Sequence, residues 1–245
     1  MVKVLGPRLM ENRKPFELKR ILIIFNLFQV IFNGWLFYEF AVSGWLTKDW
    51  SYKCQPMDYT DNPRALRMAA ACWWFYISKY IDFLDTIFFV LRKKDNQITK
   101  LHVIHHSLVP LSSWFGTTFS PGGHGTFCCF LNTFVHVVMY SYYFLAALGP
   151  KVQKYLWWKK YITTMQMIQF IAFMVHSLQL FVSNCDYPRI SISVVMVNAI
   201  IFLLLFSEFY KDTYNKKPRI TNSESFTKNG LTNYRTIRIN KHKNG

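Results

Sequence analysis

The chain has 245 residues, of which 51% are hydrophobic and 18% are aromatic, and it carries a formal net charge of +16. A helix that crosses a membrane needs about 20 predominantly apolar residues, and the chain contains six stretches of this kind. The basic residues lie between these stretches, where membrane topology accounts for them, so we expect no nucleic-acid partner.

The apolar stretches predict six transmembrane helices. They lie at roughly 21–41, 68–91, 102–118, 126–147, 160–181 and 190–210. We therefore predict an all-α fold, a polytopic membrane helix bundle over residues 21–210, preceded by a basic cytosolic segment at 1–20. The segment 211–245 is polar and basic and is predicted to be a disordered cytosolic tail.

The linkers between these helices fall alternately on the two sides of the membrane. Most of the 29 Lys and Arg residues lie on the side that holds both termini and the linkers 92–100 and 148–160. Short cytosolic loops are enriched in positive charge, so we expect both termini in the cytosol. The chain ends in KHKNG, which is similar to a retrieval signal for the endoplasmic reticulum.

Two of the five cysteines, Cys54 and Cys185, fall in linkers on the non-cytosolic side. An oxidising lumen permits disulfide bonds, so this pair is a disulfide candidate, with two free thiols as the alternative. Cys72, Cys128 and Cys129 fall within predicted helices and are expected to be small core residues.

Six ionisable residues lie inside the second apolar stretch or at the start of the third: Lys79, Asp82, Asp85, His102, His105 and His106. An ionisable residue at the centre of a membrane helix costs roughly 2.5–3.5 kcal/mol, so such a group indicates a functional site. Lys79 can pair with Asp82 three residues away, whereas Asp82 and Asp85 are like charges at the same spacing. The histidine spacing puts three imidazoles on one helical face.

Polar residues also recur on one face of the fourth and fifth predicted helices. They are Asn132, His136, Tyr140 and Tyr143 on the fourth, and Thr163, Gln166 and Gln169 on the fifth. Lipid cannot satisfy polar groups, so these side chains should face the interior of the bundle. His176, which stands alone, is expected to make an interhelical hydrogen bond.

Three kinds of protein are compatible with the histidine cluster. A di-iron desaturase would share the H-x-x-H-H spacing, but it needs several histidine boxes, and this chain has 7 histidines and one such box. A lipid or solute transporter would also place polar residues inside the membrane. Acyl transfer with a neutral histidine as nucleophile or base uses the histidines and carboxylates together.

Four strings, in order along the chain, resemble the four motifs of the very-long-chain fatty acid elongase (ELO) family. They are KYIDFLDT at residues 79–86, QITKLHVIHH at 97–106, NTFVHVVMYSYY at 132–143 and TTMQMIQ at 163–169. The resemblance covers most of residues 10–215, and four motifs in order make it highly specific.

The resemblance implies fatty acid elongation. A long-chain acyl-CoA condenses with malonyl-CoA to give 3-ketoacyl-CoA, carbon dioxide and CoA, the reaction of a very-long-chain 3-oxoacyl-CoA synthase. The family acts in the endoplasmic reticulum membrane without a metal or redox cofactor. The implied partners are acyl-CoA, malonyl-CoA, membrane lipids and other enzymes of the elongation cycle, and a homodimer is compatible with the sequence.

The resemblance also implies roles for individual residues. His105 is the candidate nucleophile, which would form an acyl-imidazole, with His136 beside it and Cys128 as the alternative nucleophile. The other catalytic candidates are His102, His106, Asp82 and Asp85. The residues expected to bind the CoA head or to line the path of the thioester are Lys79, Arg92, Lys94, Gln97, Asn132, Tyr142, Lys159, Thr163, Gln166 and Arg219.

The chain departs from the family pattern at several positions. Asp82 stands where Glu is usual, Lys100 where an apolar residue is usual, and Ile104 where an aromatic residue is common. The family has seven helices, and we expect six here, with the first one missing.

Overall fold

The computed structural model describes residues 2–215, and the described part of the chain is helical with no β-strand. The long helices are α2 (Lys19–Phe40), α3 (Pro63–Ile81), α5 (Lys100–Phe119), α6 (Thr126–Ala147), α8 (Lys159–Val182) and α9 (Arg189–Tyr214). The shorter elements are α1 (Val2–Met10), α4 (Phe83–Leu91), α7 (Pro150–Gln153), the π-helical turn η1 (Ala41–Trp45), and the 3₁₀ turns η2 (Asp95–Gln97) and η3 (Gly123–Gly125). The predicted all-α class is confirmed.

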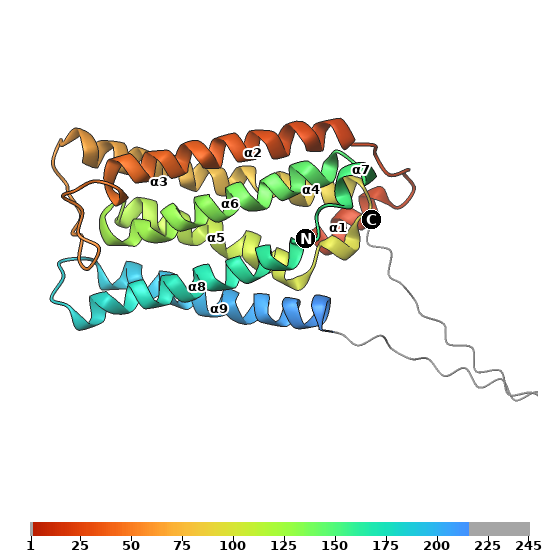
Figure 1. The fold of residues 1–245 in the computed structure, drawn as a ribbon. Coiled ribbons are helices and arrows are strands. Elements are labelled where there is room, and N and C mark those ends of the chain that lie inside the picture. The colour runs from red at the N-terminus through yellow and green to blue at the C-terminus, as the bar shows by residue number, and fades with distance from the viewer. Residues whose placement is uncertain (1, 216–245) are drawn as a thin grey trace, which may run out of the picture.

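The six long helices form a closed ring in which each helix packs on two neighbours (Figure 1). The order around the ring is α2, α3, α5, α9, α8, α6 and back to α2. The connections lie alternately at the two ends of the ring (Figure 1). We call the end that holds the linkers 46–62, 120–125 and 183–188 the disulfide end, and the end that holds 92–99 and 148–158 the basic end.

Four helical segments among the described residues are long and apolar enough to cross a membrane: Lys19–Trp45, Gly123–Ala147, Lys159–Val182 and Arg189–Tyr214. Large apolar side chains on these segments are exposed, including Ile24, Ile168 and Leu204. This is the pattern of a helix surface that faces lipid. The chain is therefore a multi-pass membrane protein, while a count of six membrane spans stays a prediction.

The predicted single helix over 68–91 is wrong, because α3 ends at Ile81 and α4 begins only at Phe83. The interruption is a single residue, since Asp82 keeps helical dihedral angles (φ −59°, ψ −19°) and its amide bonds the Ser78 carbonyl at 2.9 Å. The break lies at the residue whose carboxylate has the most polar contacts in the interior. Those contacts come from other helices, so the apolar pattern of residues 68–91 alone could not predict them.

Two of the long helices, α3 and α5, begin at a side-chain cap. Asn62 precedes α3, and its side chain accepts a hydrogen bond from the Arg64 amide at 3.0 Å, with Pro63 in the first turn. Thr99 caps α5 in the same way, accepting from the His102 amide at 3.2 Å. This cap sets where the helix that carries the histidine cluster begins.

The last helix runs further than predicted. α9 extends to Tyr214, four residues beyond the expected end of the last span at residue 210. The rest of the predicted tail, including Arg219 and the terminal KHKNG, lies outside the described residues.

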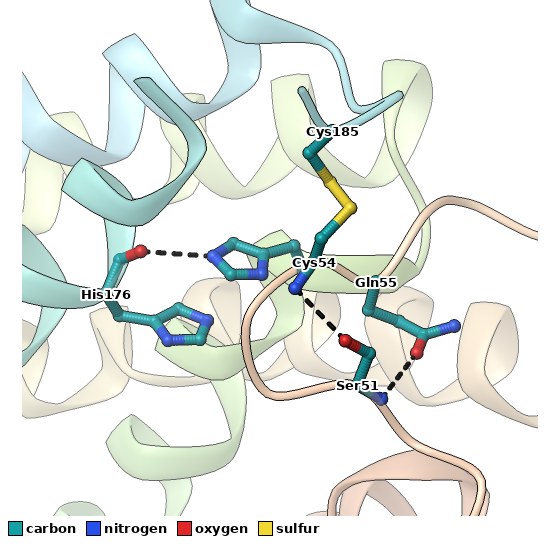
Figure 2. The surroundings of a disulfide bond; sticks show 6 residues. Ser51, Cys54, Gln55, His176 and Cys185 are labelled. Carbon is teal, nitrogen blue, oxygen red and sulfur yellow. Dashed lines mark hydrogen bonds between the residues drawn. A yellow bond between two sulfur atoms is a disulfide. The ribbon is translucent and has the colours of Figure 1, made fainter. Parts of the chain in front are cut away.

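The disulfide end is held together by Cys54–Cys185, which joins the 46–62 linker to the 183–188 linker (Figure 2). The predicted pair is thus confirmed. Beside it the rings of His124 and His176 stack at 3.8 Å, and His124 Nε2 lies 3.1 Å from the His176 carbonyl oxygen. Gly123 has a φ of 62° and faces the Gln55 carbonyl, where a Cβ would come within 2.8 Å. The two linkers and the η3 turn therefore form one packed unit.

Candidate active site

The site is centred on the Asp82 carboxylate at the α3–α4 junction, which is only 4% exposed. Its Oδ1 accepts hydrogen bonds from Gln29 Nε2 at 2.6 Å and from the Tyr140 hydroxyl at 3.1 Å. Its Oδ2 lies 3.3 Å from Lys79 Nζ. The predicted pairing of Lys79 with Asp82 is confirmed, and side chains of α2, α3 and α6 meet on one buried carboxylate.

Lys79 links this carboxylate to the next polar group. Its side chain is 2% exposed, and its ammonium also donates to Asn132 Oδ1 at 3.2 Å and lies 4.6 Å from the centre of the Phe75 ring. A buried ammonium is costly unless it is paired and hydrogen-bonded. Asp82 and Asn132 supply those contacts here, so Lys79 is satisfied by the protein itself.

Asp85 joins the cluster through Tyr140. The Tyr140 hydroxyl lies 2.8 Å from Asp85 Oδ2 and 3.1 Å from Asp82 Oδ1. A tyrosine hydroxyl carries a single proton, so it donates to one of the two carboxylates at a time. Tyr140 thereby separates the like charges that the sequence placed three residues apart.

The three clustered histidines lie together on α5 but point to different neighbours. His102 Nε2 is 2.7 Å from Thr86 Oγ1 on α4, and its ring centre is 4.2 Å from that of His106. The His105 ring lies 5.4 Å from His106 and 5.1 Å from Phe202 on α9. His105 is thus the member of the cluster that faces the α9 side of the ring.

His136 on α6 lies on the other side of Asp82. It is 5% exposed, and its Nδ1 is 4.0 Å from Asp82 Oδ2, longer than a hydrogen bond. This nitrogen has no hydrogen-bond partner among the described residues. Lys79, Asp82 and His136 therefore form one polar group. His105 lines the same cavity as Asn132, which bonds Lys79.

A cavity of about 140 Å³ meets this polar group at His105 and Asn132. Its walls come from α3, α5, α6, α8 and α9, and several are aromatic, including Phe75, Phe170 and Phe173. It extends toward the disulfide end, where Tyr187 of the 183–188 linker borders it. An apolar chain in this cavity would have one end beside His105.

The three free cysteines also border the cavity. Cys72 is buried, and Cys128 and Cys129 are partly buried, with their sulfur atoms 3.8 Å apart. The alternative nucleophile Cys128 donates to the Gly125 carbonyl at 3.0 Å. The Cys128 thiol is therefore bonded at the disulfide end of α6, whereas His136 of the same helix lies beside Asp82 in the polar cluster.

The residues predicted to hold the CoA head lie toward the basic end, outside the polar cluster. Arg92 and Lys94 follow α4 and are half-buried, whereas Gln97 and Lys159 are exposed. Tyr142 packs edge-on against Trp158 at 5.2 Å. Thr163 is buried, and Gln166 donates to the Met139 sulfur at 3.5 Å. Arg219 lies outside the described residues.

Two residues of α2 that were not predicted also belong to the site. Gln29 and Asn33 are fully buried, and Asn33 Nδ2 donates to the Gln29 carbonyl at 2.8 Å. Neither residue falls in a motif. The available signal was that Asn26, Gln29 and Asn33 recur three and four residues apart inside an apolar stretch, which places them on one helical face.

Comparison with known proteins bears on the identity of this site. The profile of the ELO family, described as the GNS1/SUR4 family, matches residues 1–222. The chain belongs to the GNS1/SUR4 family. All six ring helices and every described residue of the site fall within the matched range.

Three similar members of the GNS1/SUR4 family come from animals. A very long chain fatty acid elongase of Aedes aegypti is 57% identical over 89% of this chain and 61% of its own length. Very long chain fatty acid elongase 7 of Drosophila melanogaster is 57% identical over 89% of this chain and 66% of its own length. Very long chain fatty acid elongase 7 of Rattus norvegicus is 51% identical over 89% of this chain and 78% of its own length. The chain thus spans less than two thirds of the length of the two insect relatives.

Proposed function

We propose that this chain is a fatty acid elongase that condenses a long-chain acyl-CoA with malonyl-CoA to give 3-ketoacyl-CoA, carbon dioxide and CoA. Its membership of the GNS1/SUR4 family and the names of its relatives support this reaction. The structural observation that carries the proposal is the apolar cavity that ends at His105, beside a buried group of imidazoles and carboxylates. That arrangement suits a fatty acyl chain whose reacting carbon lies next to a neutral histidine.

In the proposed first step, a ring nitrogen of His105 attacks the carbonyl carbon of the acyl thioester. The carbon–sulfur bond breaks, CoA leaves with the proton that His105 releases, and an acyl-imidazole remains. In the second step malonyl-CoA loses carbon dioxide, and the resulting enolate carbon attacks the acyl carbon and breaks its bond to the His105 nitrogen. The released imidazole nitrogen takes up one proton from water, which restores neutral His105. No electron is gained or lost overall, so the reaction requires no redox cofactor, and we propose that no metal takes part.

The surrounding residues support these steps in three ways. The apolar walls exclude water that would hydrolyse the acyl-imidazole. Lys79 and Asn132 provide donors close to His105, where the enolate oxygen and the tetrahedral intermediate need them, and His136 lies beside them with a nitrogen lone pair that can accept a proton. We assign an orienting role to His102, His106, Asp82 and Asp85. The His102 and His106 rings contact each other, and the two carboxylates share the Tyr140 hydroxyl.

The CoA phosphates would bind outside the cavity, at the basic end. Arg92, Lys94 and Lys159 lie there, and cations of this kind form charge-assisted hydrogen bonds with phosphate. We extend the proposal to Arg219 as a further cation for the CoA head, and to Gln97, Tyr142, Thr163 and Gln166 as residues along the path of the thioester. The proposed location is the endoplasmic reticulum membrane with the basic end in the cytosol, beside other enzymes of the elongation cycle and with homodimerisation allowed.

The test is expression in microsomes with malonyl-CoA and a panel of acyl-CoAs. Carbon dioxide and 3-keto products should appear in equal amounts. His105→Ala should lower the rate at least about 100-fold, the effect expected for losing an acid–base or nucleophilic group. Ser107→Ala, on the exposed face of the same helix, should leave the rate unchanged. Malonyl-independent flux of a solute across vesicles would instead favour a transporter, and full condensing activity in His105→Ala would refute the nucleophile assignment.

A further inference from the structure

Gln29 is a carboxamide in the interior of an apolar helix, and it is 0% exposed. Burying such a group without a hydrogen bond is costly. Its Nε2 donates to Asp82 Oδ1 at 2.6 Å, across 53 residues of sequence. Asn33, one turn further along α2, donates to the Gln29 backbone carbonyl at 2.8 Å and anchors this turn of the helix.

The two oxygens of Asp82 have different neighbours. Oδ1 accepts from Gln29 and Tyr140, whereas Oδ2 faces the Lys79 ammonium and lies 4.0 Å from His136 Nδ1. A carboxylate can rotate about its terminal torsion unless its oxygens are held. Tyr140 can donate its single proton to Asp82 or to Asp85, so Gln29 is the donor that always holds Oδ1, and Oδ2 is then directed at Lys79 and His136.

We propose that Gln29 is a positioning residue for the condensation, which fixes the Asp82 carboxylate so that Oδ2 faces His136 and Lys79. The inference rests on the proposed function. The nearest Asp82 oxygen lies 4.0 Å from Nδ1, so only a small shift is needed for a hydrogen bond between them. That bond favours the tautomer with the proton on Nδ1, which leaves the Nε2 lone pair available for chemistry. Gln29 does not border the cavity, so it acts through Asp82 and does not touch substrate.

A structural role for Gln29 makes a different prediction. Polar side chains often join membrane helices by hydrogen bonds, and Gln29 would then matter only for attaching α2 to α3. Losing it would lower the yield and the melting temperature of the protein. The kcat of the folded fraction and its dependence on pH would stay as in the wild type.

The experiment compares three variants in purified, detergent-solubilised protein: Gln29→Leu, Gln29→Glu and Asn26→Leu. Gln29→Leu keeps the approximate size of the side chain and removes the donor. Gln29→Glu keeps the shape and donates only while the carboxyl is protonated. Asn26→Leu is the matched control, because Asn26 is similarly buried one turn earlier in α2. Folding is checked by size-exclusion profile and melting temperature, and kcat and KM for both substrates are measured across pH.

Gln29→Leu is expected to lower kcat by about 10- to 100-fold, as when a hydrogen-bond partner behind a metal-ligating side chain is removed. KM for both substrates should change little, because Gln29 contacts neither of them. Asn26→Leu should keep the kcat of the wild type. Gln29→Leu with wild-type kcat, or an equal loss in the two leucine variants, would overturn the inference.

Gln29→Glu separates the donor from the shape. The ionisable groups around Asp82 are Lys79 on α3, Asp85 on α4, His105 and His106 on α5, and His136 and Tyr140 on α6. These groups are present in both the wild type and Gln29→Glu. The ratio of variant to wild-type kcat at each pH therefore reports the effect of the new carboxyl group alone. That ratio should be highest near about pH 6 and fall toward about pH 8, because an ionised carboxylate cannot donate and repels Asp82. A variant as slow as Gln29→Leu at the acid end contradicts the donor role.

The same measurements distinguish failure of the proposed function from failure of the role assigned to Gln29. A folded wild-type protein that makes no 3-keto product refutes the proposed function, and the inference with it. A wild type that condenses normally while Gln29→Leu does the same refutes the inference alone.

Discussion

At the residue scale, Asp82 shows how a short side chain is accommodated in a membrane interior. Glutamate is usual at this position in the family motif, and aspartate reaches one methylene less far. Here the carboxylate lies at the junction of α3 and α4 and contacts Gln29, Tyr140 and Lys79 directly. The shorter side chain is therefore long enough to make these contacts from its position between the two helices.

The charge on Asp82 should matter more than the charge on Asp85. Asp82→Asn leaves the Lys79 ammonium buried without its counterion, which typically costs about 3–5 kcal/mol when one member of a buried pair is removed. Asp85 is bonded by the Tyr140 hydroxyl and by no cation among the described residues. Asp85→Asn should therefore lower the melting temperature far less. Equal losses in the two asparagine variants would show that the Lys79 pair does not stabilise the fold.

The acyl-enzyme can be trapped to separate the two candidate nucleophiles. Incubation with a long-chain acyl-CoA in the absence of malonyl-CoA should leave the acyl group on the peptide that carries His105, detected by mass spectrometry after proteolysis. His105→Ala should abolish the modified peptide, whereas Cys128→Ser should retain it, because Cys128 bonds to Gly125 away from the polar cluster. Acylation at Cys128 would reverse the assignment.

At the element scale, the linkers of the disulfide end connect helices that are distant in sequence. Cys54 and Cys185 are 131 residues apart, and their bond ties the linker before α3 to the linker before α9. Tyr187 follows in the second linker, donates to the Gly122 carbonyl at 3.2 Å and borders the cavity. The bond therefore stabilises the part of the fold that forms this end of the cavity.

Removing the bond should destabilise the protein without touching the polar cluster. The double variant Cys54→Ser/Cys185→Ser is expected to lose about 2–5 kcal/mol of folding free energy. Thermal unfolding in detergent measures the loss, and Cys129→Ser serves as a control that keeps the disulfide. Reduction of the wild type should reproduce the shift in melting temperature, and an unchanged melting temperature after complete reduction would contradict it.

At the scale of the whole molecule, the ring of six helices explains how a chain this apolar encloses a polar centre. Each helix presents apolar side chains outward, as at Ile24 and Leu204, while Gln29, Lys79 and His136 lie inside. The cavity occupies the interior between this centre and the disulfide end. The space available to an apolar ligand is thus set by several helices together.

Filling the cavity from one helix should change which acyl chains are accepted. Gly116 on α5 borders the cavity, and a Cβ added there would meet no atom within 4 Å. Gly116→Leu should therefore fold normally and shift the product profile toward shorter acyl-CoA substrates. Leu111→Ala changes the exposed side of the same helix and should leave the profile unaltered. The readout is the chain-length distribution of 3-keto products, and an unchanged distribution would mean that substrate does not occupy this space.

The apolar runs predicted the order and approximate bounds of the ring helices, and loop position correctly paired Cys54 with Cys185. The break at Asp82 was not predictable, because residues 68–91 contain no Gly or Pro that would mark it. Gln29 was missed for a related reason. Its partner becomes evident only once α2 is known to pack beside α3 and α6, and this is a property of the tertiary fold.

The three free thiols of the cavity wall give the protein intrinsic attachment points for probes. Cys72, Cys128 and Cys129 border the same cavity from α3 and α6, whereas Cys54 and Cys185 are already bonded to each other. A thiol-reactive spin label or fluorophore admitted to that space would report whether it is filled or empty. Occupancy of the interior can therefore be followed spectroscopically in the unaltered polypeptide.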